Sequence, residues 1–195
     1  MEAFDYLVAA IIAMTPGLEL DEAQAHVEAA VSASEEFGYE PEFLLAQAWV
    51  ESRFQRRDFS RMECRKGKCK RVTGVWESDA LPKGAKPTYY CGAMQVGGNI
   101  SWERCQELME DLTLNYRVGA AHLWKWEGRY VNKDPECRKF KVGTQKRRTC
   151  ALLGYGGGWK ALTNKTSTYP ARIYFIERKI RIHIKKAEKE DKGNV

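Results

Sequence analysis

The spacing of apolar residues predicts a chain built mainly from α-helices. In the first part of the sequence, apolar positions recur at helical spacing over residues 4–14, 19–37 and 41–53. Pro16 and Gly17 separate the first two of these segments. The third segment is apolar on nearly every side, which is typical of a helix inside a hydrophobic core. We therefore expect two N-terminal helices followed by a buried one.

The same pattern predicts four more helices later in the chain. They are expected over residues 101–109, 111–126, 149–155 and from Tyr169-Pro170 onward. Ser101 is placed to cap the first of them. The glycine run 156–158 is expected to end the third. The last has one apolar stripe, so its Lys and Arg residues are expected to form a solvated outer face.

Two polar stretches interrupt the helical pattern. Residues 56–90 contain two cysteines, two prolines and several turn residues, which predicts a loop-rich insertion with short strands. Residues 188–195 are too polar to be held by a core and are expected to form a charged, mobile tail. A chain of 195 residues fits one domain, with N-terminal helices over 1–39 and a core over 40–187.

Acidic and basic residues are divided unevenly along the chain. Eleven of the 26 Asp and Glu lie in the first 52 residues, whereas all 32 Lys and Arg follow them. A basic surface on a globular core suggests an anionic polymer as partner, and nucleic acid and cell-wall polymers both qualify. Part of the positive charge is also expected to face the acidic N-terminal helices. No apolar run is long enough to predict a transmembrane segment.

The six cysteines are even in number, and several pairings are possible. Pairing between sequence neighbours is the hypothesis, namely Cys64–Cys69, Cys91–Cys105 and Cys137–Cys150. The cysteines and three histidines show no metal-ligand spacing, so no metal site is expected. Disulfides imply an oxidising destination, which is the periplasm, the extracellular space or a virion. The first residues lack the positive charge of a signal peptide and are expected to belong to the domain.

Glu51 is the strongest single candidate for chemistry. It follows the apolar run 43–50 at the end of the expected buried helix. Burial among apolar neighbours disfavours the ionised carboxylate and raises its pKa, as a general acid acting on a glycosidic oxygen requires. The alternative is a solvated last-turn glutamate that pairs with Arg53 or Arg56.

Four segments, in sequence order, carry a resemblance to a known family. They are Glu51-Ser52, the Gly-Ala-Met-Gln-Val run 92–96, the helical residues 115–123, and residues 151–158, in which Tyr155 precedes the glycines. In that order they resemble the soluble lytic transglycosylase domain, which is related to goose-type lysozyme. The resemblance covers about residues 40–180. It implies a mainly α, lysozyme-like single domain with a loop-rich, disulfide-stapled insertion.

The resemblance implies cleavage of peptidoglycan between N-acetylmuramic acid and N-acetylglucosamine. Glu51 would protonate the leaving oxygen, and the acetamido group of the substrate would act as the internal nucleophile. Glu51 would then accept a proton from the sugar 6-hydroxyl, which gives a 1,6-anhydro product. A glycan strand is thus the expected partner, in place of nucleic acid. The expected protein is a monomer that needs no cofactor.

The resemblance also implies roles for five other residues. Tyr155 matches a tyrosine whose hydroxyl can reach the glutamate or the acetamido group and help to set the catalytic geometry. Ser52, Gly92, Met94 and Gln95 are expected to bind the substrate. Glycine would allow a sugar ring to approach the backbone, while the methionine and the amide would contact the ring and its hydroxyl or acetamido groups.

The chain departs from the family pattern in two places. Gly154 stands where the family has alanine, and Gly156 stands where it has asparagine, so an amide is lost beside the tyrosine. The insertion before Gly92 is long and carries Asp58, Glu77 and Asp79. If one of these carboxylates held a water across the cleft, the enzyme would be a hydrolysing, goose-type muramidase.

A different class of function remains open from the sequence. The alternative is a non-catalytic protein that binds peptidoglycan or forms part of a virion. Such a protein would have kept the fold and lost enzymatic turnover through changes near the site. Such a protein would bind insoluble peptidoglycan without releasing soluble fragments.

Overall fold

The computed structural model describes residues 2–65, 68–75, 88–98, 100–165 and 167–193, and only the backbone of residues 60–65, 68–75 and 88. Within these residues the α-helices are α1 (Ala3–Met14), α2 (Leu20–Phe37), α3 (Pro41–Ser52), α4 (Trp102–Glu110), α5 (Leu112–Lys125), α6 (Gln145–Asn164) and α7 (Tyr169–Gly193). The strands are β1 (Asp58–Arg65), β2 (Lys68–Val75), β3 (Thr88–Cys91) and β4 (Val96–Gly98). The prediction of a mainly helical chain is confirmed.

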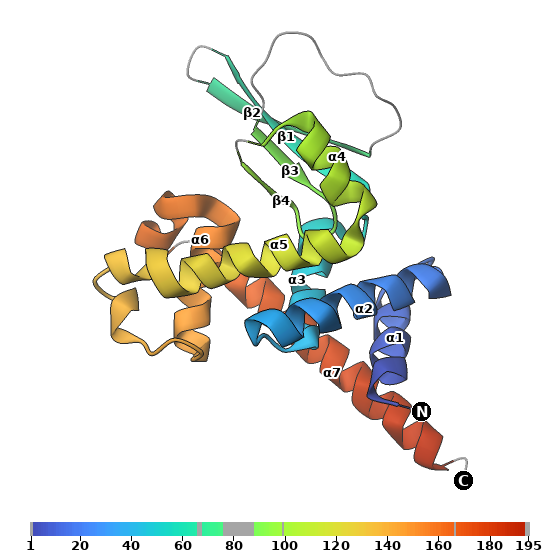
Figure 1. Ribbon diagram of the computed structural model, residues 1–195. Helices are drawn as coiled ribbons and strands as arrows, with labels where there is room; N and C mark the ends of the chain where they lie inside the picture. The colour runs from blue at the N-terminus through green and yellow to red at the C-terminus, as the bar shows by residue number, and fades with distance from the viewer. Residues whose placement is uncertain (1, 66–67, 76–87, 99, 166, 194–195) are drawn as a thin grey trace.

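Helix α3 lies at the centre of the molecule. Its residues from Phe43 to Ala46 are fully buried, as expected for a helix that is apolar on nearly all sides. α3 packs against α2 and α7, while α2 packs against α5 and α1 packs against α7. Figure 1 shows the sheet and α4 at one end of the molecule, α6 at one side, and α7 projecting past α1. The end of α3 therefore points toward the junction of these parts.

Helix α6 differs from the prediction at both ends. It begins at Gln145, where the Thr144 hydroxyl accepts a hydrogen bond from the Arg147 amide at 3.3 Å. The helix is interrupted within the predicted glycine run, at Gly158, whose φ of 64° and ψ of −160° are non-helical and well tolerated by glycine. Gly156 and Gly157 remain helical, and a further helical stretch, which was not predicted, follows the kink as far as Asn164.

The C-terminal segment is not the separate tail that its polarity predicted. α7 runs without a break to Gly193. Near its end, Asp191 accepts a hydrogen bond from the Tyr6 hydroxyl at 2.8 Å. Packing against α1 therefore extends the helix beyond the last residue of its apolar stripe.

The insertion contains more regular structure than short strands. β1 and β2 are each eight residues long and pair as an antiparallel hairpin. The full sheet is antiparallel in the order β2-β1-β3-β4. The register places Cys64 opposite Cys69, as the predicted pairing requires, but these side chains lie outside the described part. Glu77 and Asp79 also lie outside it.

The other two predicted disulfides are confirmed. Cys91–Cys105 joins β3 to α4, with 5.5 Å between the Cα atoms. Cys137–Cys150 joins the short helix η3 (Cys137–Lys139) to α6, with 6.0 Å between the Cα atoms. Each links two elements close in sequence, as neighbour pairing implied.

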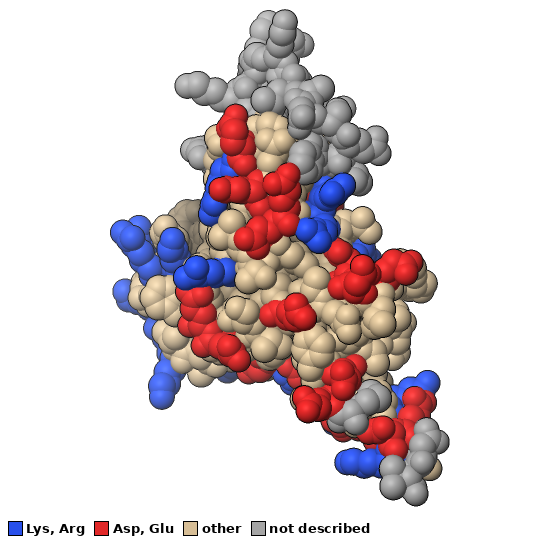
Figure 2. Space-filling model, turned by 45° about the vertical axis from the view of Figure 1, so that its right-hand side comes forward, with Lys and Arg blue, Asp and Glu red and all other residues tan. Residues whose placement is uncertain are grey.

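Ion pairs join the acidic and basic parts of the chain, as predicted. They are Arg56–Glu22 at 3.4 Å, Arg117–Glu36 at 2.7 Å, Arg148–Glu40 at 2.6 Å and Arg181–Glu42 at 3.9 Å. Figure 2 shows acidic side chains spread over one face and basic ones gathered mainly at its left edge. None of the described helices has the length and apolar character needed to cross a membrane.

Candidate functional site

A cavity of about 490 Å³ lies where α3, the sheet, α5 and α6 meet. Its volume is in the range of small-molecule binding sites, about 300–1,000 Å³. Its walls are aromatic rings, glycine backbone and a few polar side chains. The lining residues are Glu51, Tyr90, Gln95, Val96, Gly97, Gly98, His122, Trp126, Gly154, Tyr155, Gly156, Gly157 and Gly158.

Glu51 lies in the last turn of α3 and lines this cavity. It is partly exposed, and its Oε1 accepts a hydrogen bond from the Tyr169 hydroxyl at the start of α7. Burial, followed by the charge of Glu51, raises the pKa of Tyr169 well above its ordinary value. The phenol therefore stays protonated at neutral pH and remains a donor that orients the carboxyl group.

Gln47 supports this pair from inside the protein. It lies one turn before Glu51 on α3 and is fully buried. Its side-chain amide lowers the pKa of Tyr169, against the larger effects of burial and of Glu51. No described group meets the Gln47 amide with good hydrogen-bond geometry. The inner side of the site therefore contains a polar group that the apolar pattern of α3 did not reveal.

A buried histidine holds the turn that follows Glu51. Arg53 and Phe54 both have positive φ, 59° and 65°, so the chain reverses sharply after α3. His26 Nε2 donates to the Phe54 carbonyl at 3.0 Å, since a carbonyl can only accept. Nδ1 of the same ring shares a hydrogen bond with the Tyr116 hydroxyl at 3.0 Å. α2 and α5 thus fix the end of α3 together.

Ser52 does not line the cavity, in contrast to its predicted role in substrate binding. It is buried, and its hydroxyl donates to the Ala93 carbonyl at 2.9 Å, with the Ala48 carbonyl at 3.2 Å. The serine next to Glu51 therefore attaches α3 to the turn between β3 and β4.

Gly92 is buried and is not among the residues that line the cavity. Its φ is +74°, and a Cβ there would lie 2.7 Å from Cγ of Asn115. Asn115 clamps the turn on both sides, because Oδ1 accepts from the Met94 amide at 2.8 Å and Nδ2 donates to the Cys91 carbonyl at 2.9 Å. Only glycine lets this buried amide approach so closely.

Met94 is fully buried, whereas Gln95 reaches the cavity. The Met94 side chain packs against Gly119 of α5, so it cannot contact a ligand as predicted. Gln95 has a φ of 46°, and its amide donates to the carbonyls of Asp58 and Gly92, each at 3.1 Å. Of the four predicted substrate-binding residues, only Gln95 lines the cavity.

Tyr155 lines the cavity, but its hydroxyl donates to the Met94 carbonyl at 2.8 Å. Its ring stacks with the Tyr169 ring, with 6.4 Å between centroids and 5° between planes. Burial and then the Glu51 charge raise its pKa well above the ordinary value. The hydroxyl that donates to Glu51 belongs to Tyr169, a contact that was considered for Tyr155.

The glycines at 154 and 156 have a steric reason. A Cβ at Gly156 would lie 2.8 Å from the Tyr169 ring, and a Cβ at Gly154 would overlap the Trp126 ring. The two rings occupy the space that larger side chains would need. One of these rings belongs to Tyr169, whose hydroxyl reaches Glu51.

Sequence reasoning missed two lining residues, His122 and Trp126, and also Tyr169, which contacts Glu51. Tyr169 was noted only as the start of a helix, and His122 only as part of a helical segment. The described residues contain no cluster of His, Cys, Asp or Glu arranged to hold a metal.

Comparisons with known proteins found no matching family model, no matching curated protein and no matching solved structure.

Proposed function

We propose that the protein cleaves the β-1,4-linked glycan of peptidoglycan by lytic transglycosylation, in a lysozyme-like domain, with Glu51 as general acid and then base. One observation carries the proposal. Glu51 lines a cavity of about 490 Å³ and is held there by a tyrosine hydroxyl, beside a glycine-rich wall. A proton donor fixed at the surface of a cavity is what glycosidic bond cleavage needs.

The walls suit a sugar polymer. Glycines at 97, 98 and 156–158 bring backbone groups to the surface, where they can exchange hydrogen bonds with hydroxyl and acetamido groups. Tyr90, Tyr155 and Trp126 offer apolar ring area against which a sugar can pack.

The carboxylates favour transglycosylation over hydrolysis. Among the described lining residues, Glu51 is the sole acidic one. Asp58 does not line the cavity, and its backbone carbonyl accepts from Gln95. Hydrolysis with inversion or through a covalent enzyme intermediate requires a second carboxylate, whereas a route through the acetamido group does not.

The proposed reaction balances without water. Glu51 gives its proton to the glycosidic oxygen as that bond breaks, and the acetamido oxygen closes onto the anomeric carbon. The Glu51 carboxylate then removes the proton of the 6-hydroxyl, whose oxygen displaces the acetamido oxygen. The product is a 1,6-anhydro sugar, and Glu51 is returned to its protonated form.

The test is mass spectrometry of the products released from purified peptidoglycan. Wild type and Glu28→Gln, an exposed control on α2, are expected to release anhydro-muropeptides, and Glu51→Gln is expected to release none. Reducing muropeptides would replace transglycosylation by hydrolysis. If wild type binds peptidoglycan and releases nothing, the protein is a non-catalytic wall-binding protein.

A further inference from the structure

His122 is a titratable side chain of the cavity that the proposed reaction does not use. It lies on α5 and lines the cavity together with Tyr155 and Trp126. It also lines a second hollow of about 340 Å³, between α5 and the end of α2. Its ring therefore forms part of the wall between two open spaces.

Trp126 determines the protonation state of this imidazole. Trp126 Nε1 lies 2.9 Å from His122 Nε2. An indole N–H can only donate, so Nε2 must be the unprotonated acceptor and the neutral ring carries its hydrogen on Nδ1. A proton on Nε2 would place two N–H donors, those of His122 and Trp126, opposite each other with no acceptor between them. Trp126 is itself fixed, because its ring fills the space above Gly154.

The surroundings of His122 do not stabilise a positive charge. Lys125 lies on the same helix, the Tyr155 ring lies edge-on at 5.2 Å, and Glu51 is the acidic group of the shared cavity. On the second hollow, Arg117 is paired with Glu36. No described carboxylate forms an ion pair with His122, and no described group accepts from its Nδ1.

We propose that His122 contacts the ligand in this cavity, with the Trp126 indole holding its imidazole neutral and reserving Nδ1–H for an acceptor oxygen of an N-acetylated sugar. This role rests on the proposed glycan function and adds a residue to it. The Nδ1–H of the neutral ring can donate to the carbonyl oxygen of an acetamido group, which is an acceptor.

Acid is expected to weaken this contact. Burial, and then the charge of Lys125, lowers the pKa of His122 below its ordinary value of 6.5. The ring is therefore neutral at neutral pH and becomes protonated only when the pH falls below this lowered pKa. Protonation breaks the bond from Trp126 and places a second positive charge near Lys125, so glycan affinity falls as the pH drops through this lowered pKa.

The test uses the Glu51→Gln protein, which holds glycan without cleaving it, and the hexamer of N-acetylglucosamine. Calorimetric titration at several pH values below 7.5 is expected to give an affinity that falls with acidification. His122→Phe is expected to bind about tenfold more weakly at neutral pH and to lose the pH dependence, since a hydrogen bond contributes about 1 kcal/mol. His122→Gln keeps a donor and is expected to bind well at every pH. His183→Gln, on α7, is the matched control.

A second measurement does not depend on the glycan. Nitrogen NMR of the free protein is expected to show the Nδ1–H tautomer at His122, and Trp126→Phe is expected to raise the pKa of that histidine. Unchanged hexamer affinity and pH profile in His122→Phe would overturn the His122 role and leave the glycan function standing. If no protein binds the hexamer or peptidoglycan, both fail, whatever tautomer is found.

Discussion

Two glutamates of this protein each accept a hydrogen bond from a tyrosine hydroxyl, in opposite settings. Glu51 accepts from Tyr169 and lines an open cavity. Glu127 accepts from Tyr39 at 3.0 Å, and its other oxygen accepts from the Gly143 amide at 2.7 Å. Glu127 is only 3% exposed. The same pair of residue types can thus face a ligand or be enclosed by the fold.

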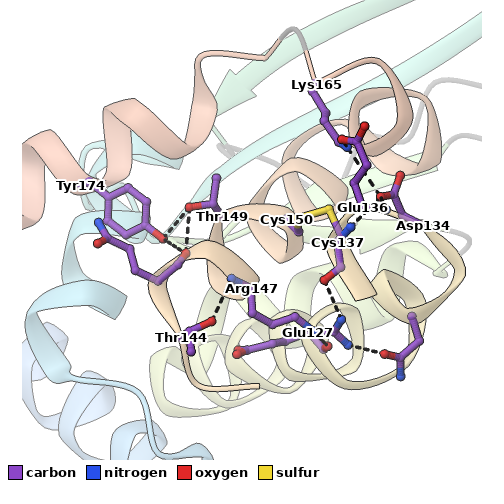
Figure 3. Close-up of a disulfide and its surroundings, with 12 residues drawn as sticks. Glu127, Asp134, Glu136, Cys137, Thr144, Arg147, Thr149, Cys150, Lys165 and Tyr174 are labelled. Atoms are coloured by element: carbon purple, nitrogen blue, oxygen red, sulfur yellow. Dashed lines mark hydrogen bonds and ion pairs between the residues drawn. A yellow bond between two sulfur atoms is a disulfide. The ribbon is translucent and has the colours of Figure 1, made fainter. Parts of the chain in front are cut away.

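In the enclosed region around Glu127, other groups of the chain supply the hydrogen-bond partners of the buried polar side chains. Arg147 is buried beside the Cys137–Cys150 disulfide, as Figure 3 shows. Its guanidinium donates to the carbonyls of Glu127 and Cys137 and to Oδ1 of Asn132, at 2.8, 3.1 and 2.6 Å. A buried polar cluster with every partner in place stabilises one structure. The cavity instead presents polar groups to open space, so function is expected there.

The strongest test of the comparison is the same substitution at both carboxyl groups. Glu51→Gln is expected to lower the rate of peptidoglycan cleavage about 10³-fold and to leave thermal unfolding nearly unchanged, because a proton donor is lost at a cavity surface. Glu127→Gln is expected to lower the free energy of unfolding by about 1–3 kcal/mol and to keep most activity in the folded protein. Loss of peptidoglycan turbidity measures the cleavage rate, and urea unfolding measures stability. An equal loss of activity in the two variants would contradict the difference proposed between Glu51 and Glu127.

Arg147→Met tests how tightly the enclosed region is bound. It leaves the two buried carbonyls of Glu127 and Cys137 without their donor, so we expect the free energy of unfolding to fall by about 3–5 kcal/mol. Arg138→Met changes an exposed arginine in the neighbouring helix η3 and is expected to cost less than about 0.5 kcal/mol. Urea unfolding measures the free energy of unfolding of each variant. Similar losses in the two variants would contradict a stabilising role for the hydrogen bonds of Arg147.

The two confirmed disulfides separate stability from function. Replacing Cys137 and Cys150 by serine is expected to cost about 3 kcal/mol of unfolding free energy while the folded protein keeps its cleavage rate. Replacing Cys91 and Cys105 is expected to cost a similar amount and also to slow cleavage, because Cys91 adjoins the turn that carries Gln95. Activity is measured below the unfolding transition of each variant. An unchanged rate in the second pair would show that the turn holds without its disulfide.

Alkaline pH is expected to weaken both regions by a smaller amount. Burial raises the pKa of Tyr39, Tyr155 and Tyr169 above their ordinary value of 10.0. Above pH 10 the unfolded chain loses these protons and the folded chain keeps them, so the free energy of unfolding falls as the pH rises, by up to about 1.4 kcal/mol per pH unit for each tyrosine. Tyr39→Phe and Tyr169→Phe should each reduce the slope by one tyrosine. If neither variant changed the dependence of the unfolding free energy on pH, the raised pKa of these tyrosines would be contradicted.

Local patterns predicted most of the fold. The buried helix with Pro41, the Ser101 cap and the disulfides Cys91–Cys105 and Cys137–Cys150 each depend on residues close in sequence, and these are present. The glycine run also predicted the interruption of α6 at Gly158, but not the helical stretch that follows it. Nor did glycine content indicate that the rings of Trp126 and Tyr169 occupy the space beside Gly154 and Gly156.

The site depended on contacts between distant segments. Glu51 was identified from its helix and reaches the cavity, but its partner Tyr169 is 118 residues away and belongs to another helix. No local pattern indicates that approach. The inward direction of Ser52 and Met94 likewise follows from packing against the β3–β4 turn and α5.

The hydrogen bond from His26 to Phe54 has a consequence for any attempt to shorten the protein. His26 belongs to α2, outside the region of residues 40–180 that carries the family resemblance, yet it secures the turn that follows Glu51. A fragment that starts at residue 40 would leave the Phe54 carbonyl and the Tyr116 hydroxyl without their partner and expose the side of α5 that α2 covers. The smallest transplantable unit of this protein therefore includes α2.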